Sequence, residues 1–377
     1  MLTFLFGTIL LYGQNTLQEI QNYPIEPTYQ PLTVRANIVI LTKEDGTGNF
    51  DMKDKEQREL LTDYVNRVNS IYANLGPAED PKICKQTSYL VTDTKIRMVY
   101  NFITIKNEYG WNYMNAGGDP DNNNLRGFSP SEKWYLTDVD KSIHENPQYQ
   151  KGINVFLTTN GDKFSKMEQE KGKNFDLNTN AAAQLPSTRN LERSSQVHMP
   201  NRYIKYLYHK FQVPVEYNST WKETREWHLQ DAKGLAHEFG HNFGLTHTNQ
   251  CSNALMKQGV RKDKYFISEM ELRTMHWNLS ASNLMQFVTP ESAYGATWYL
   301  NENTEWKAPR RFYHNFEIAK DVTLTISETI ILPPQAFVKL NKGSKIIFKG
   351  KGKIIDANGK EFTHFRKHKK SQVIYEP

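Results

Sequence analysis

The chain has 377 residues, of which 38% are apolar and 12% aromatic, so its composition is that of a globular protein and excludes a low-complexity chain. This length accommodates one large domain and a smaller companion. The 47 basic and 41 acidic residues give a formal net charge of +6, but no nucleic-acid-binding motif accompanies this excess, which argues against a DNA or RNA partner.

An apolar run opens the chain. Residues 1–13 are too few to anchor the protein across a bilayer and are typical of a signal peptide, although a positively charged start is missing. A buried hydrophobic strand is the alternative. Cleavage after Gly13 would leave residues 14–30 as a linker. No second apolar run is long enough to cross a membrane, so the sequence predicts a secreted or cell-surface protein without a transmembrane anchor.

Residues 31–289 have the pattern of an α+β domain. Residues 34–41 cluster β-branched side chains as a strand does, and a helix is predicted over residues 54–75, with apolar residues at helical spacing that should pack on a sheet. Residues 96–105 and 153–157 supply two further strands. Together they predict a twisted sheet covered by a long helix.

A polar loop is predicted between these last two strands, over residues 117–124. Its Asp119 and Asp121 offer carboxylates to calcium, but their spacing fits no calcium-loop template, so a plain surface loop is the alternative.

The most informative segment is His237-Glu238-Phe239-Gly240-His241-Asn242-Phe243-Gly244-Leu245-Thr246-His247. Residues four apart on a helix share one face, so His237 and His241 can bind one metal ion. Gly244 can adopt positive φ, stop the helix and return the chain so that His247 reaches the same ion. Three protein ligands leave a position open for water, and Glu238 is placed to take its proton, which is the arrangement of a catalytic zinc.

This motif resembles the long zinc-binding signature of the metzincin metallopeptidases. Residues 234–288 are most similar to compact secreted bacterial members related to pappalysins, which implies a zincin-like fold, a catalytic Zn²⁺ held by His237, His241 and His247, bacterial export, and a protein or peptide substrate. The predicted helix over residues 268–279 resembles the last helix of such domains.

The resemblance also implies a methionine turn beneath the metal. Met256 is the preferred candidate and Met285 the second, with core filling as the alternative for either. Some relatives carry a tyrosine two residues beyond the methionine, but Gln258 stands there in this sequence, so no role is assigned to it.

Residues 181–186 stand where this family has the edge strand that borders the substrate cleft. An extended peptide could pair with such an edge, although a simple loop is equally compatible with the sequence. Residues 195–199 would then form the next strand inward. The role of the aromatic-rich segment 203–227 is not assigned.

The chain has two cysteines, Cys84 and Cys251. In an exported protein a single pair is expected to oxidise if the geometry allows, and a bridge would tie the first half of the chain to the loop beside the metal. Two buried thiols are the alternative.

After residue 290 the pattern changes to short β-like runs at residues 322–326, 337–340, 345–348 and 353–355, separated by glycines. They predict a C-terminal β domain over residues 290–377, either a small β-solenoid or a β-sandwich, that could bind a surface or a glycan. The basic run 366–370 is expected to be a solvated tail.

These observations favour a secreted zinc endopeptidase that hydrolyses peptide bonds with Glu238 as general base. The alternative from another class is a non-catalytic surface adhesion or glycan-binding protein in which the metal site is structural. A zinc hydrolase acting on a non-peptide amide or ester is a third interpretation.

Overall fold

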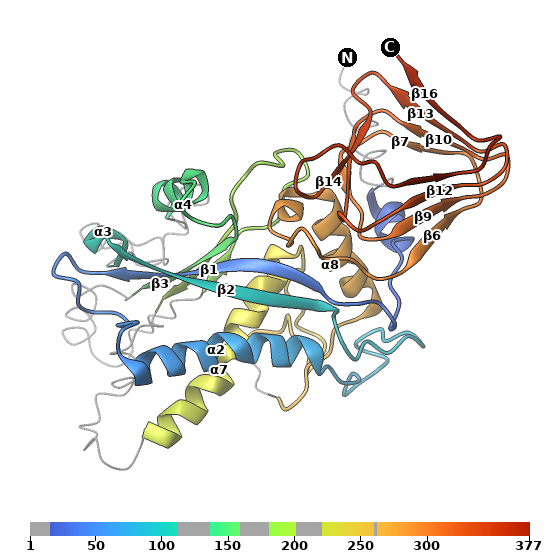
Figure 1. The fold of residues 1–377 in the computed structure, drawn as a ribbon. Coiled ribbons are helices and arrows are strands. Elements are labelled where there is room, and N and C mark those ends of the chain that lie inside the picture. Colours follow the sequence, from blue (N-terminus) through green and yellow to red (C-terminus); the bar gives the residue numbers. More distant parts are fainter. Residues whose placement is uncertain (1–15, 112–135, 159–180, 201–220, 260–261) are drawn as a thin grey trace, which may run out of the picture.

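The computed structural model describes residues 16–111, 136–158, 181–200, 221–259 and 262–377, which form a mixed α+β unit followed by a unit of short strands (Figure 1). The first unit contains the strands β1 (Leu32–Thr42), β2 (Ile96–Lys106), β3 (Ile153–Thr158), β4 (Ala182–Ala183) and β5 (Gln196–Pro200). Its helices include α2 (Lys55–Ala73), α3 (Glu108–Trp111), α4 (Thr137–Glu145), α7 (Trp221–Asn242), α8 (Glu269–Ala281) and the short 3-10 helix η2 (Asn283–Gln286), and residues 16–21 are helical as well.

The five strands form one sheet in the order β2-β1-β3-β5-β4. All pairs are parallel except β4, which runs antiparallel to β5 at the edge. The strands predicted over residues 34–41, 96–105, 153–157 and 195–199 are confirmed, each with slightly wider or shifted bounds. The segment 181–186, where a strand and a loop were both compatible with the sequence, contributes the two-residue edge strand β4.

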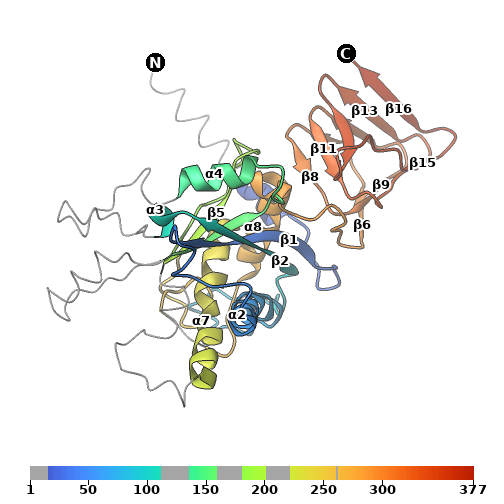
Figure 2. The same cartoon turned by 60° about the vertical axis from the view of Figure 1, so that its left-hand side comes forward.

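Helices cover both faces of this sheet. Helices α2 and α7 lie on one face, and α3 and α4 on the other (Figure 1; Figure 2). Two apolar clusters accordingly flank the sheet: a large one with α2, α7 and α8, and a smaller one that includes Ile143 of α4 and Trp111 of α3. Strand β1 contributes to both clusters, because its buried side chains alternate between the two faces.

The predicted long helix is present as α2. The Asp54 side chain caps its first turn by accepting a hydrogen bond from the Gln57 backbone N–H at 3.0 Å. Its buried stripe packs on the sheet and on α7, and the Tyr72 hydroxyl donates to the Ala236 carbonyl at 3.0 Å. Helix α2 thus supports the helix that carries the first two histidines of the motif.

The C-terminal unit is a coil of short parallel strands. It comprises β6 (Thr297–Leu300), β7 (Thr304–Trp306), β8 (Arg310–Arg311), β9 (Asn315–Ile318), β10 (Thr323–Ile326), β11 (Thr329–Leu332), β12 (Val338–Leu340), β13 (Lys345–Lys349), β14 (Lys353–Asp356), β15 (Phe365–Lys367) and β16 (Gln372–Glu376). They form three sheets, β6-β9-β12-β15, β7-β10-β13-β16 and β8-β11-β14, in which each strand pairs with the strand one coil away. Parallel pairing throughout is the geometry of a solenoid and not of an antiparallel sandwich.

The basic run 366–370 is not a tail. Its first two residues belong to β15, the next three form the turn that follows, and the chain continues into β16 (Figure 2). The run is solvated as expected, since all five residues are exposed. The expectation of a tail was wrong because it rested on charge alone, whereas apolar residues on both sides of the run, Phe365 and Val373, pack against the solenoid core.

The solenoid is joined to the first unit by hydrogen bonds and shared apolar packing. The buried guanidinium of Arg311 donates to three backbone carbonyls just after α8, those of Met285 at 2.8 Å, Val288 at 2.7 Å and Thr289 at 2.6 Å. The Tyr313 hydroxyl donates to the Leu279 carbonyl of α8 at 2.6 Å, and its ring belongs to the large apolar cluster of the first unit. The first coil therefore packs as an extension of the α+β unit.

Several sequence expectations lie outside the described residues: the apolar run 1–13, the loop 117–124 with Asp119 and Asp121, and most of the aromatic-rich segment 203–227. Among the residues that are described, none of the helices has the length and apolarity to span a membrane.

Helix α8 carries a buried histidine with a defined protonation state. Its first turn is closed by a capping box between Ser268 and Glu271, which confirms the predicted helix start. His276 Nε2 lies 2.7 Å from the Thr94 carbonyl, which can only accept, so Nε2 carries the proton and Nδ1 accepts from the Tyr294 hydroxyl at 2.6 Å. Burial lowers the pKa of His276 to about 4.

This histidine should make folding stability depend on pH. Because its folded pKa lies below the value of about 6.5 in the unfolded chain, the neutral ring stabilises fully above about pH 6.5, and this stabilisation is lost as the pH falls toward about 4. Between pH 7.5 and 5 the loss should be about 2 kcal/mol. His276→Gln, which keeps a donor for Thr94, should reduce the pH dependence of urea unfolding by that amount.

Exposed His368 provides the matched control, and His368→Gln should retain the parental pH dependence of unfolding. A parental pH dependence in the His276→Gln variant would contradict the assignment.

Candidate metal centre

The histidine motif begins on α7 and continues past its end. Helix α7 stops at Asn242, and Gly244 has φ +93°, with Gly244 N–H donating to the His241 carbonyl and Leu245 N–H to the Gly240 carbonyl, both at 2.9 Å. This pair of bonds is a Schellman motif, which ends a helix and reverses the chain. A side chain at Gly244 would also collide with the side-chain amide of Asn278, which lies against the position of a Cβ.

The reversal brings three imidazoles together. His247 Nε2 lies 3.0 Å from His241 Nε2 and 3.1 Å from His237 Nε2, and the candidate ligand atoms of all three residues lie within 4.8 Å of one another. His237 is buried, His241 is half-buried and His247 is exposed. The cluster therefore opens to solvent on the side of His247.

Backbone carbonyls fix which nitrogen of each helical histidine faces the cluster. His237 Nδ1 lies 2.9 Å from the Leu255 carbonyl and His241 Nδ1 lies 2.8 Å from the Leu245 carbonyl, so both Nδ1 atoms donate when the rings are neutral. Burial is the main cause that lowers the pKa of His237 to about 3 and also lowers the pKa of His241 and His247, which favours neutral rings.

This arrangement fits a metal ion. With both Nδ1 atoms protonated, His237 and His241 direct unprotonated Nε2 lone pairs toward the same point as His247, and a single proton cannot bridge three lone pairs. A cation bound to all three satisfies them, and carbonyl-anchored neutral imidazoles are the usual ligands of such sites. The group could thus bind a metal through His237, His241 and His247.

Met256 packs beneath this group. Gly240 lies between the two helical histidines, and a Cβ at that position would approach the Met256 sulfur to 2.5 Å, so only glycine admits the methionine side chain there. The Met256 carbonyl accepts from Thr248 N–H at 3.2 Å, next to the third histidine. The second candidate, Met285, lies in η2, where its carbonyl accepts from Arg311.

Lys233 and Gln258 lie near the histidines, and Glu238 is adjacent to His237 in the sequence. Glu238 follows His237 on α7 and is 7% exposed. Lys233, one helical turn before His237 and also 7% exposed, donates to the Lys257 carbonyl, and its charge contributes to the lowered pKa of His237 and His247. Gln258 places its amide nitrogen 3.4 Å from His247 Nε2. No role was assigned to Lys233 from the sequence, although its spacing of four from His237 places both residues on one face of the helix.

The edge strand β4 is tied to the end of α7. The Asn242 side-chain amide donates to the Gln184 carbonyl at 2.7 Å and lies 3.3 Å from the Gln196 carbonyl of β5. The sheet edge formed by Ala182 and Ala183 is thereby held next to the helix that carries the histidines.

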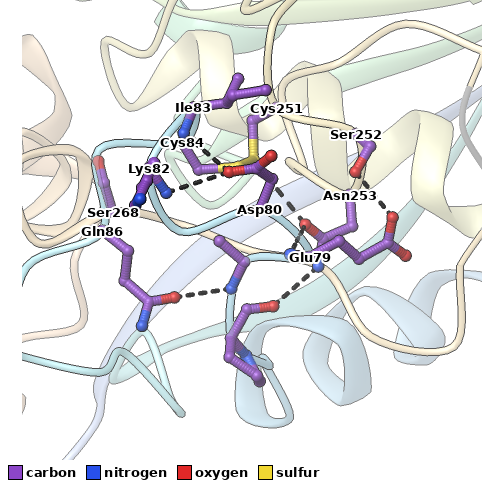
Figure 3. Close-up of a disulfide and its surroundings, with 12 residues drawn as sticks. Glu79, Asp80, Lys82, Ile83, Cys84, Gln86, Cys251, Ser252, Asn253 and Ser268 are labelled. Atoms are coloured by element: carbon purple, nitrogen blue, oxygen red, sulfur yellow. Dashed lines mark hydrogen bonds between the residues drawn. A yellow bond between two sulfur atoms is a disulfide. The ribbon is translucent and has the colours of Figure 1, made fainter.

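A disulfide joins Cys84 to Cys251, with their Cα atoms 4.8 Å apart (Figure 3). The alternative of two buried thiols is thus not what the structure contains. Around the bridge, Asn253 accepts from Glu79 N–H at 3.0 Å and donates to the Pro77 carbonyl at 2.9 Å. The loop between His247 and Met256 is therefore fixed to a segment about 170 residues earlier in the sequence.

No protein-family model matches the chain, and no curated protein is significantly similar to it. The functional interpretation therefore depends on the geometry of these residues.

Removing the disulfide should destabilise the protein. Closing such a long loop restricts the unfolded chain, and loss of a native bridge typically costs about 2–5 kcal/mol. We expect Cys84→Ala combined with Cys251→Ala, which keeps both positions apolar, to lower the free energy of urea unfolding by that amount. A reducing agent should lower the parental value similarly and leave the double variant unchanged. Equal stability of parent and double variant would contradict this role.

Proposed function

We propose that the protein is a zinc-dependent endopeptidase of the metzincin class, with a zincin-like catalytic unit over residues 31–289. The observation that carries this proposal is the convergence of three Nε2 atoms from His237, His241 and His247, with the buried Glu238 next to His237 in the sequence. Met256 packed against Gly240 supports it, because it matches the methionine turn implied by the sequence motif.

Zinc is the metal that this donor set suits best. Three imidazoles without a thiolate or a further carboxylate among the grouped residues form the ligand set of catalytic zinc sites, which keep a fourth position open. When bound, zinc would polarise a substrate carbonyl and increase the acidity of a water molecule at the open position.

Glu238 is the proposed general base. It is adjacent in sequence to His237 on the same helix, and its low exposure restricts the water around its carboxylate. It would accept a proton from the attacking water and deliver that proton to the nitrogen of the departing amine, so that it returns to its initial state after each cycle.

The substrate would be an extended polypeptide. Strand β4 is antiparallel to β5 and ends the sheet, and Asn242 holds it beside α7. Backbone pairing with this edge would orient a peptide without demanding a particular sequence and bring one of its carbonyls to the exposed side of the histidine group. Export from the cell is part of the proposal, supported by the disulfide and by the apolar run 1–13.

One experiment distinguishes this proposal from two other functions, a hydrolase of non-peptide substrates and a binding protein with a structural metal. Purified protein is incubated with a mixed peptide library, and cleavage is identified by mass spectrometry with and without a chelator. Cleavage that stops on chelation and returns with zinc would support a zinc peptidase. Intact peptides together with turnover of simple amides or esters would favour another hydrolase, and bound zinc without any turnover would favour a binding protein with a structural metal.

Substitutions should distinguish the role of Glu238 as general base from the role of the histidines as metal ligands. Glu238→Gln is expected to retain about one zinc ion per chain and to lose peptide cleavage by about three orders of magnitude or more, because the amide cannot accept the proton. His241→Ala should lose both zinc and cleavage. Zinc content is read by atomic absorption and cleavage by the library assay. Parental cleavage by Glu238→Gln would show that another residue is the base.

A further inference from the structure

The positive charge of the chain is concentrated in the last coils of the solenoid. Residues 338–370 contain 11 of the 47 lysine and arginine residues but only two of the 41 acidic residues, Asp356 and Glu361. All 11 basic side chains are exposed. The remaining chain has slightly more acidic than basic residues, so the net charge of +6 arises entirely from this segment.

Part of this charge is stacked at one corner of the solenoid. The turn between β12 and β13, residues 341–344, lies under the turn between β15 and β16, residues 368–371. Hydrogen bonds on either side of the turns fix this stacking: His368 N–H donates to the Leu340 carbonyl and Gln372 N–H to the Ser344 carbonyl, both at 3.0 Å. Both turns carry lysines, Lys342 in the lower one and Lys369 and Lys370 in the upper one.

Lys345, at the start of β13, extends this group, and we name Lys342, Lys345, Lys369 and Lys370 the cationic corner. Within the described part of the chain, none of the four forms an ion pair. On the preceding coil, Asp321 pairs with Lys320 at 3.6 Å and Glu317 with Lys339 at 3.0 Å. Adjacent strands of a sheet lie about 4.8 Å apart, so the lysines of the two turns lie on neighbouring coils, and neither turn contains an acidic residue.

We propose that the cationic corner binds an acidic polysaccharide, such as a polymer of uronate or sulfated sugars. Anionic groups repeating along a linear polymer complement lysines that repeat from coil to coil. The two turns contain no Phe, Tyr or Trp for stacking nucleic-acid bases. They also contain no large apolar side chain, whereas a membrane-binding surface typically adds apolar side chains that insert into the bilayer. The site is independent of the proposed peptidase chemistry.

The test uses the full chain and two matched triple variants. Lys342→Gln, Lys369→Gln and Lys370→Gln remove three charges from the corner. Lys351→Gln, Lys353→Gln and Lys360→Gln remove three charges from exposed positions between β13 and the residues after β14. Binding to immobilised polygalacturonate and dextran sulfate is measured at low and physiological salt, with uncharged dextran as the blank. We expect about tenfold weaker binding for the corner variant, about twofold at most for the control variant, and weakening of the parent by salt.

Three results would overturn the proposal: no binding of the parent to either acidic polymer, equal weakening by the two triple variants, or tighter corner-dependent binding to duplex DNA than to both polysaccharides. The second would indicate attraction by net charge alone, and the third would assign the corner to nucleic acid. Because binding is measured without turnover, its failure leaves the peptidase proposal unaffected. Failure of the library assay likewise leaves this one unaffected.

Discussion

The candidate site depends on two hydrogen bonds that the histidine motif itself does not reveal. Leu255 and Leu245 present their carbonyls to Nδ1 of His237 and His241, at 2.9 and 2.8 Å. A neutral imidazole that donates from Nδ1 has its lone pair on Nε2, so these contacts determine both the tautomer and the direction of each ring. His247 joins the same point only because the chain reverses after α7. The geometry of the site is thus set by backbone groups.

Those backbone groups belong to a loop that needs support of its own. Met256 lies against Gly240 and so fixes the loop to α7 at the level of the histidines. The other end is held by the bridge from Cys251 to Cys84 and by the amide of Asn253, which makes two hydrogen bonds with the segment around residue 78 (Figure 3). Covalent, polar and apolar contacts act on fewer than ten residues. The carbonyls that orient the histidines need such redundant support, because small displacements of these carbonyls would turn the imidazole rings away from their shared point.

Local periodicity made much of the structure predictable. Helix geometry predicts from the spacing that His237 and His241 share one helix face and that the helix ends near Gly244. Apolar alternation predicts the strands of the sheet, and capping residues predict the start of α8. The Leu255 carbonyl contact and the pairing of Cys84 with Cys251 join residues that are far apart in sequence, and no local pattern encodes such contacts. The run 366–370 was misread for the same reason, since its support comes from coils that precede it.

The solenoid is connected to the candidate site through α8. Tyr313 of the first coil donates to the Leu279 carbonyl of this helix, and the neighbouring Asn278 donates to the Phe243 carbonyl at 3.0 Å, one residue before Gly244. Asn278 therefore satisfies a carbonyl at the end of α7 that no residue within the helix can reach. A β unit that merely followed the first unit on a linker would leave this region of α8 bare. In this protein the first coil packs on α8 and buries it. Because α8 stabilises the chain reversal that leads to His247, the first coil is part of the support of the site.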